Sequence, residues 1–359
     1  MSITLDGSLG ITSPSETVPN TFSSSSNFGF KNKIINGACV IDQRNAGASG
    51  TASNVYTVDR FQYAASQASK GTWGQNLNSV TLPVGFTNYL GFQSSSAYTV
   101  GVAEVFRLQQ SIEGLNVSDL GWGTANASAV TLSFKVYSSL TGTFGGAISN
   151  SASSRSYPFS YSIPVANTWA NISITIAGDT TGTWLTTNGI GAFIKWSLGA
   201  GATPSGTAGT WASADYTSAT GAVSVVGTSG ATFYITGVQL EKGSTATSFD
   251  YRPYGTELAL CQRYYWQNTL FASGCFGGGV GNVPIVTTLY PVSMRAAPTF
   301  AWISGGIASD GINDFTITSN YGATTATSGA YVLFNQSGSG ASGRGCVVRN
   351  ATCSFSAEL

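Results

Sequence analysis

The chain has 359 residues, of which only 8% are charged, and its 15 basic and 15 acidic residues give a formal net charge of zero. Average globular proteins carry roughly 25% charged residues. Neither a basic stripe of the kind that binds nucleic acid nor an apolar run long enough to cross a bilayer is present, so we expect no nucleic-acid partner and no membrane insertion. The hydrophobic share of 42%, with 12% aromatic residues, favours folded domains over disorder, and the length suits two domains and a tail.

Residues 1–31 are predicted to form an N-terminal arm. The arm contains Pro14, Pro19 and the serine tract 23–26, and it has too little apolar surface to offset the entropy of ordering on its own. We expect it to be flexible in solution and to serve as an attachment or trimerisation peptide, with a dispensable tail as the alternative. It lacks the basic start and apolar core of a signal peptide, so we expect synthesis in a cytoplasm.

Residues 32–255 are predicted to form an all-β, antiparallel jelly-roll sandwich. Val130, Leu132, Phe134 and Val136 alternate with polar residues, which is the period of a half-buried strand. Several such segments follow one another without a helix between them, and this pattern is typical of a sandwich. The expected strands are 33–39, 57–64, 103–111, 129–137, 155–164, 170–176, 191–198 and 232–240. The segment 200–232, rich in small residues, is expected to be a long loop or hairpin.

A short helix is predicted to link this sandwich to a second domain. Pro253 and Gly255 end the extended segment, and Thr256 can cap a linker helix over 256–270, in which apolar residues recur at helical spacing. Short strands separated by glycine turns then predict a small β-domain over 271–359. Its expected strands are 284–290, 300–303, 314–318, 330–334, 346–349 and 352–355.

Three segments carry a resemblance to a known family. The run from Gly237 to Tyr265 (GVQLEKGSTATSFDYRPYGTELALCQRYY) resembles the junction common in tail-fibre and other appendage proteins of tailed bacteriophages. The opening residues 2–12 are similar to the virion-anchoring start of many such fibres, although the Asp-Gly-Thr and Gln that usually follow are absent here. Residues 291–299 resemble a segment of their distal domains.

This resemblance implies an architecture and a role. Residues 1–31 would anchor the chain to the virion, residues 32–255 would be a carbohydrate-binding-module-like jelly roll, and residues 271–359 would be a distal, receptor-facing domain. The protein would be a homotrimeric virion component that attaches to a host-surface glycan. Alternatives are a capsid-attached fibre, knob or decoration protein, a soluble lectin, and a glycan depolymerase.

Aromatic side chains are the best candidates for ligand binding and for the oligomer interface. Trp73, Trp122, Trp184 and Trp211 are expected in loops or near strand ends, where a ring could stack on the apolar face of a sugar; a core plug or a subunit contact is the alternative. Trp169 and Trp196 are expected in the core. The three aromatics Tyr264, Tyr265 and Trp266 are predicted to pack on a threefold axis.

We expect no enzymatic activity. The chain contains no histidine, and its 15 acidic residues are scattered singly, whereas glycoside hydrolysis needs two carboxylates facing each other across a cleft. Asp59 and Arg60 are expected to be structural, as a local ion pair or a loop anchor.

Metal and cysteine chemistry are expected to be minor. No cofactor is expected, although jelly rolls of this type often hold a structural calcium, for which Asp42, Asp59 and Asp250 are candidates. The five cysteines are expected to be buried free thiols in a cytosolically assembled protein. A Cys346–Cys353 bridge is the alternative, as is zinc, for which CxxC spacing and histidine are lacking.

Overall fold

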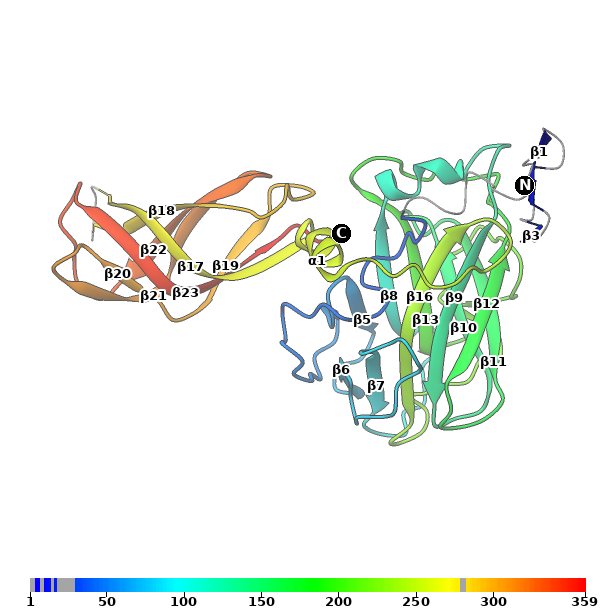
Figure 1. Ribbon diagram of the computed structural model, residues 1–359. Helices are drawn as coiled ribbons and strands as arrows, with labels where there is room; N and C mark the ends of the chain where they lie inside the picture. The colour runs from blue at the N-terminus through cyan, green and yellow to red at the C-terminus, as the bar shows by residue number, and fades with distance from the viewer. Residues whose placement is uncertain (1–3, 7–9, 14–15, 18–29, 278–281) are drawn as a thin grey trace.

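The computed structural model describes residues 4–6, 10–13, 16–17, 30–277 and 282–359. A narrower barrel projects from one side of a broad sandwich, and the helix α1 (Tyr254–Gln262) lies where they meet (Figure 1). Most of the predicted arm, 1–31, is outside the described residues. Three short antiparallel strands are described there: β1 (Thr4–Asp6), β2 (Gly10–Ser13) and β3 (Glu16–Thr17).

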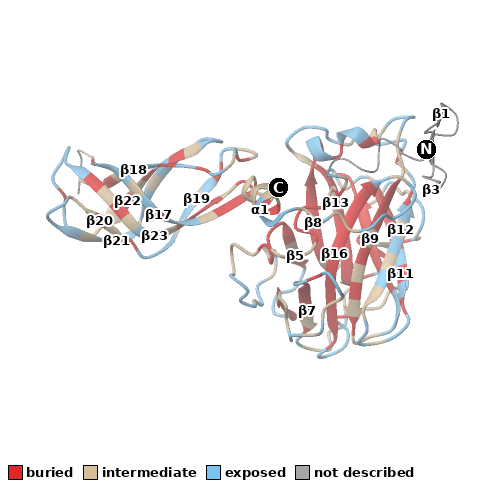
Figure 2. Cartoon of the chain, viewed as in Figure 1, coloured by how far each residue is buried: buried red, intermediate tan, exposed pale blue. Residues whose placement is uncertain are grey.

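The sandwich consists of two antiparallel sheets packed face to face. The six-stranded sheet runs in the order β11 (Ser156–Ile163), β10 (Gly142–Ser149), β13 (Ile190–Ala200), β8 (Val105–Glu113), β5 (Phe61–Ala65) and β4 (Val55–Tyr56). The five-stranded sheet runs in the order β12 (Ala170–Ile176), β9 (Val130–Ser138), β16 (Thr232–Lys242), β7 (Leu90–Ser94) and β6 (Gly71–Gln75). Alternating side chains such as Leu132 and Phe134 fill the space between the sheets, which appears as the red interior of Figure 2. The predicted all-β sandwich is confirmed.

The predicted strand 33–39 is wrong. Asn36 and Cys39 have positive φ angles of 60° and 56°, which lie outside the β region. The Asn36 amide instead holds a turn, because it donates to the carbonyls of Ile41 (2.8 Å) and Asp59 (2.9 Å). The sequence pattern also missed β6, β7 and β10, whose glycines suggest turns. In β10, a Cβ at Gly145 would lie 2.5 Å from Ser218 Oγ, so close packing requires the glycine.

The predicted loop 200–232 covers the outer face of the six-stranded sheet. It contains only the short parallel pair β14 (Ser205–Gly206) and β15 (Ser218–Ala219). Lys195 on β13 is 1% exposed beneath it and pairs with Asp215 at 2.8 Å. This face of the sandwich is therefore closed by the chain itself.

The linker helix is shorter than predicted. It ends at Gln262, and β17 (Tyr265–Phe276) begins three residues later, so residues 265–270 are strand and not helix. Aromatic and β-branched residues in this stretch favour a strand, and β17 pairs with β23 (Gly345–Ser356) along its length. Pro253, not Thr256, precedes the first helical residue. Within the described ranges, no helix is long and apolar enough to span a membrane.

The C-terminal β-domain, also predicted, is a closed barrel. The strands that follow β17 are β18 (Pro284–Leu289), β19 (Thr299–Ser304), β20 (Ile307–Ser309), β21 (Asp314–Thr325) and β22 (Gly329–Gln336). The order β17-β18-β22-β21-β20-β23 closes through the β17–β23 pairing, and β19 pairs with β23 as well. Trp266, Phe276, Phe334 and Phe355 fill its interior. The two short strands predicted at 346–349 and 352–355 are one continuous strand, β23.

Candidate functional site

The four tryptophans predicted to bind ligand lie in two places. Trp73 is 5% exposed on β6, where its indole nitrogen donates to the Ala52 carbonyl (2.8 Å). Trp122, Trp184 and Trp211 come together at one end of the sandwich, with ring centroids 4.6–5.5 Å apart and interplanar angles of 76–82°. Trp122 is buried, and Trp184 and Trp211 are half-buried against the core.

The indole nitrogens of this cluster are already satisfied by backbone carbonyls. Trp122 donates to Ser128 (2.8 Å) and Trp211 to Ala177 (2.8 Å). Because the rings pack edge to face on one another, much of their surface is used within the chain. Ligand binding by these four residues stays a prediction.

A hollow of about 450 Å³ lies over the outer face of the five-stranded sheet. Its floor consists of alternate, outward-facing positions on β12, β9 and β16, brought level by the register Asn171↔Lys135↔Thr236 and Ser173↔Ser133↔Gln239. The floor therefore offers hydroxyl and amide groups beside one lysine.

Aromatic side chains from two loops form the walls of this hollow. Phe86, Phe249 and Tyr251 pack on one another with centroids 4.8–5.5 Å apart. Gly237, with φ +60°, sits in the bulge of β16, and a Cβ there would lie 2.8 Å from the Phe86 ring. The glycine therefore leaves room for the Phe86 ring. Tyr251 remains 57% exposed, and partial desolvation raises the pKa of its hydroxyl. A tyrosine hydroxyl is protonated at neutral pH in any case and can donate a hydrogen bond.

The same sheet face continues as an aromatic strip. Tyr137 stacks on Tyr234 (5.3 Å, 13°), and Trp169 packs against Tyr137 and Tyr89 at 5.6 and 5.7 Å. Trp169 was predicted to be in the core, but it lies half-buried at this outer face, and its nitrogen donates to the Thr81 carbonyl (2.8 Å). Tyr137 and Trp169 thus extend the apolar surface beyond the hollow.

This arrangement suits recognition of a polyhydroxylated ligand. Aromatic faces pack on the apolar side of a sugar ring, while hydroxyl, amide and ammonium groups satisfy its oxygens. Among the described residues that line the hollow, Lys135 is the single charged one, and no carboxylate is present. Hydrolysis through two facing carboxylates therefore has no candidate pair among these residues.

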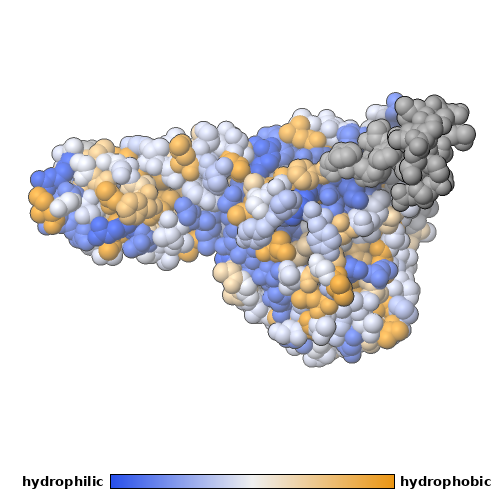
Figure 3. Space-filling model, viewed as in Figure 1, coloured by the Kyte–Doolittle hydropathy of each residue, from blue (hydrophilic) through white to orange (hydrophobic). Residues whose placement is uncertain are grey.

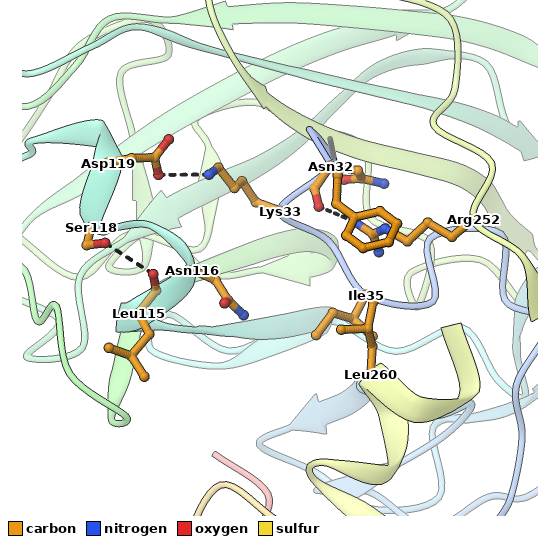
Figure 4. Close-up of a pocket in the computed structure, with 10 residues that line it drawn as sticks. Asn32, Lys33, Ile35, Leu115, Asn116, Ser118, Asp119, Arg252 and Leu260 are labelled. Carbon is orange, nitrogen blue, oxygen red and sulfur yellow. Dashed lines mark hydrogen bonds and ion pairs between the residues drawn. The ribbon is translucent and has the colours of Figure 1, made fainter. Parts of the chain in front are cut away.

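A second hollow, of about 360 Å³, lies near the junction (Figure 4). Its charged groups pair with each other. Lys33 Nζ lies 2.7 Å from Asp119 Oδ1, and Arg252 donates to the Asn32 and Ile34 carbonyls and to Glu257. These groups are engaged by the chain itself, so the hollow on the sheet is the better candidate site.

The predicted interface aromatics do not present an exposed surface. Tyr264, Tyr265 and Trp266 are 0%, 7% and 8% exposed within one chain. Tyr264 donates to Glu113 (2.6 Å), Tyr265 lies under the Arg44 guanidinium (3.5 Å), and Trp266 stacks on Phe355 (5.4 Å). The sandwich and the barrel bury all three within one chain, and their expected role at an oligomer interface stays a prediction.

The calcium candidates do not converge. Asp42 accepts hydrogen bonds from the backbone of Asn45 and Gly47, Asp59 lies 3.7 Å from Arg44, and Asp250 accepts hydrogen bonds from the backbone of Lys31 and Asn32. No group of three or more acidic or cysteine side chains that could hold a metal occurs in the described part of the chain. All five cysteines are free, and Cys275 is exposed, contrary to the expectation that all are buried. Cys346 and Cys353 lie seven residues apart on one extended strand, at roughly 3.3 Å per residue, which is too far for a bridge.

Part of the hollow could be predicted from local sequence patterns. Ser133 and Lys135 alternate with buried residues on β9, which marks them as outward-facing. The wall residues come from segments distant in sequence, around residues 84–86 and 246–251. No local pattern connects these two loops, so only the folded sheet brings them together.

The chain was also compared with known proteins. No protein-family model matches it, and no curated protein matches it. Similar solved structures include the enzymatically active domain of bacteriophage CBA120 tailspike protein 4, at 11% identity and a TM-score of 0.33; the match covers 59% of this chain and 22% of the tailspike chain.

Carbohydrate-binding modules are also among the similar structures. The module TmCBM61, solved in complex with β-1,4-galactotriose, matches at 10% identity and a TM-score of 0.32, over 60% of this chain and 100% of that chain. A CBM4 module matches at 11% identity and a TM-score of 0.31, over 58% and 98% respectively.

Proposed function

We propose that this chain is a virion appendage protein of a tailed bacteriophage and that its sandwich binds a host-surface glycan without cleaving it. The observation that carries the binding role is the hollow on the five-stranded sheet. Aromatic walls from Phe86, Phe249 and Tyr251 enclose a polar floor that contains no carboxylate. The virion role is supported by the sequence resemblance of the junction, the opening and residues 291–299.

Within this proposal, residues 1–31 attach the protein to the tail or the capsid, and the barrel over 271–359 faces the host. Deletion of residues 1–30 should leave a folded protein that no longer joins the particle. Incorporation of the truncated protein into particles would overturn the anchoring role. The assembled protein is proposed to be a homotrimer.

Tyr251 offers the sharpest test of glycan binding. It is 57% exposed at the rim of the hollow, and Tyr254, 65% exposed, lies outside it. Tyr251→Ala should weaken binding to a responsive polysaccharide about tenfold, the loss expected for one stacked aromatic ring, while Tyr254→Ala should not change it. Affinity electrophoresis against a polysaccharide panel measures this. Equal effects of the two substitutions, or no binding to any polysaccharide, would count against the proposal.

A soluble lectin or a glycan depolymerase remains the functional alternative. A depolymerase releases new reducing ends from the polysaccharide that it binds, so the same panel should be assayed for them. A lectin without a virion role would bind glycan but would be absent from purified particles.

A further inference from the structure

We infer that the glycan recognised in the hollow is acidic and that Lys135 binds its anionic substituent. This inference rests on the proposed glycan-binding function and adds a ligand class to it. Lys135 is near the centre of the floor, between Asn171 on β12 and Thr236 on β16. It is the single charged residue among the described residues that line the hollow.

The ammonium group of Lys135 has neutral partners. Its Nζ donates to Asn171 Oδ1 at 2.6 Å and lies 5.7 Å from the centre of the Phe86 ring. It takes part in none of the ion pairs found between described residues, whereas Lys33 and Lys195 pair with Asp119 and Asp215. One of its three N–H groups is engaged by Asn171, and the others can reach a ligand.

The one acidic residue on strands β12, β9, β16, β7 and β6 is Glu241, and it forms no ion pair with Lys135. Glu241 lies two outward-facing positions along β16 from the level of Lys135 and is 3% exposed. Its oxygens accept hydrogen bonds from Gln239 (2.8 Å) and from the backbone and hydroxyl of Thr247 (2.8 and 2.7 Å). The other residues of strands β12, β9, β7 and β6 are uncharged apart from Lys135. A neutral floor with one cation therefore favours a ligand that carries negative charge.

The geometry fits a carboxylate or a sulfate ester on a sugar. A hydrogen bond between an ammonium group and an anion is stronger than one between neutral groups. The amide of Asn171 and the hydroxyls of Ser133 and Ser173 line the same floor and can bind the neighbouring sugar hydroxyls. The carboxylate of a uronic acid and a sulfate ester present the same chemistry to Lys135, so the experiment must separate them.

The experiment compares matched pairs of polymers. Polygalacturonate, hyaluronan and alginate are each tested against their carboxyl-reduced forms, and carrageenan against its desulfated form, by affinity electrophoresis with the full-length protein. Wild type should bind at least one anionic polymer about tenfold more tightly than its neutral counterpart. A tenfold change is at the lower end of the range expected for a hydrogen bond to a charged group. Which pair responds distinguishes carboxylate from sulfate.

Variants of Lys135 then assign the preference. Lys135→Gln should bring the two affinities of the responsive pair together, and Lys135→Arg should keep the preference. Lys242→Gln is the control, because Lys242 is an exposed residue that does not line the hollow. It removes the same charge and should behave as wild type. Raising the salt to about 0.5 M should weaken wild-type binding to the anionic polymer, because salt screens the charge, and should leave Lys135→Gln unchanged.

The outcomes separate this inference from the proposed function. Equal binding of charged and neutral members by wild type, or a preference that survives in Lys135→Gln, would overturn the acidic-ligand inference while glycan binding stands. Failure to bind any polymer in the panel would overturn both.

Discussion

Arg263, the residue that follows helix α1, donates two hydrogen bonds to the buried carboxylate of Glu113 at the end of β8. The Nη2–Oε1 distance is 2.6 Å and the Nε–Oε2 distance is 2.9 Å, and Tyr264 donates a third hydrogen bond at 2.6 Å. Glu113 belongs to the sandwich, and Arg263 and Tyr264 lead into the barrel. The pair therefore joins the two parts of the molecule where they meet (Figure 1).

We expect Glu113→Gln to destabilise this junction. The Glu113 side chain is 1% exposed and that of Arg263 is 31% exposed, and hydrogen bonds to a charged group contribute about 1.5–3 kcal/mol. Differential scanning calorimetry should show a lower melting temperature for the variant. Asp314→Asn is the matched control, because Asp314 is 52% exposed in its pair with Arg349 and such surface pairs contribute about 0–1 kcal/mol. Equal melting temperatures for Glu113→Gln and wild type would contradict the assignment.

The same pair predicts acid sensitivity. Burial by itself raises the pKa of Glu113, but the hydrogen bonds from Arg263 and Tyr264 and the charge of Arg263 outweigh burial and hold the pKa below its ordinary value. Its stabilising contribution is therefore complete above the unfolded-state pKa of about 4.3 and is lost as the pH falls through the lower folded-state pKa. The melting temperature of wild type should fall more steeply than that of Glu113→Gln below about pH 4.3. Parallel curves would show that Glu113 does not cause the acid sensitivity.

The ion pairs at the junction could not be predicted from the sequence. Asp59 and Arg60 are adjacent and were expected to pair locally or to anchor a loop. In the structure, Asp59 lies beside Arg44 and accepts a hydrogen bond from the Gln43 backbone (3.0 Å), as a loop anchor does, whereas Arg60 reaches Glu358, 298 residues away. Alternation within β9 and β12 was enough to predict strands, because that pattern is local. Pairing across the junction depends on how two domains meet, and neighbouring residues carry no signal of it.

In the candidate site, too, local patterns predicted the strand residues but not the contacts between distant segments. The floor residues Ser133 and Lys135 could be placed on an outward face from period two alone. The tryptophans were chosen because they lie beside glycines, yet Trp122, Trp184 and Trp211 pack on one another. No local pattern marks Phe86 or Tyr251, whose ring centroids come within 5.5 Å of each other from segments distant in sequence.

Gly237→Ala should destabilise the sandwich and alter the hollow. An alanine at φ +60° costs about 1–2 kcal/mol, and its Cβ would also meet the Phe86 ring at 2.8 Å. Gly255→Ala is the matched control, because Gly255 lies in helix α1 with open space around it, and alanine there should stabilise by about 0.4–1 kcal/mol. Chemical denaturation followed by circular dichroism measures both. An unchanged free energy of unfolding for Gly237→Ala would mean that the bulge tolerates a side chain.

The tryptophan cluster and the sheet hollow can be separated by one pair of variants. If the hollow binds the glycan, Trp184→Ala should lower stability by about 1–3 kcal/mol through lost packing and leave glycan affinity within about twofold of wild type, a difference of less than 1 kcal/mol. Tyr251→Ala should do the reverse. Affinity electrophoresis and thermal melting on both variants decide between the two sites. If only Trp184→Ala weakened binding, the tryptophan cluster and not the hollow would be the glycan-binding site.

The barrel carries an exposed apolar surface, which we expect to form the proposed trimer contact. Phe271 on β17 and Leu289 on β18 are 80% and 76% exposed, and both strands belong to the barrel, where they pair with each other from Gly274↔Val286 to Phe276↔Pro284. Tyr331 on β22, 44% exposed, follows on the same face. Strands β17, β18 and β22 carry no charged residue, and hydrophobic groups appear among neutral ones on the barrel in Figure 3. An exposed apolar face without charge is typical of a contact between protein surfaces.

We therefore expect Phe271→Asp combined with Leu289→Asp to convert a trimer into monomers, because each subunit would bring two unpaired charges into the apolar contact. Multi-angle light scattering on purified protein gives the mass directly. Ile312→Asp is the control, since Ile312 is 74% exposed in the turn between β20 and β21, away from this face, and should leave the mass unchanged. A trimer that survives the double substitution would place the interface elsewhere. A monomeric wild type would show that the isolated chain does not trimerise and that any assembly requires the particle.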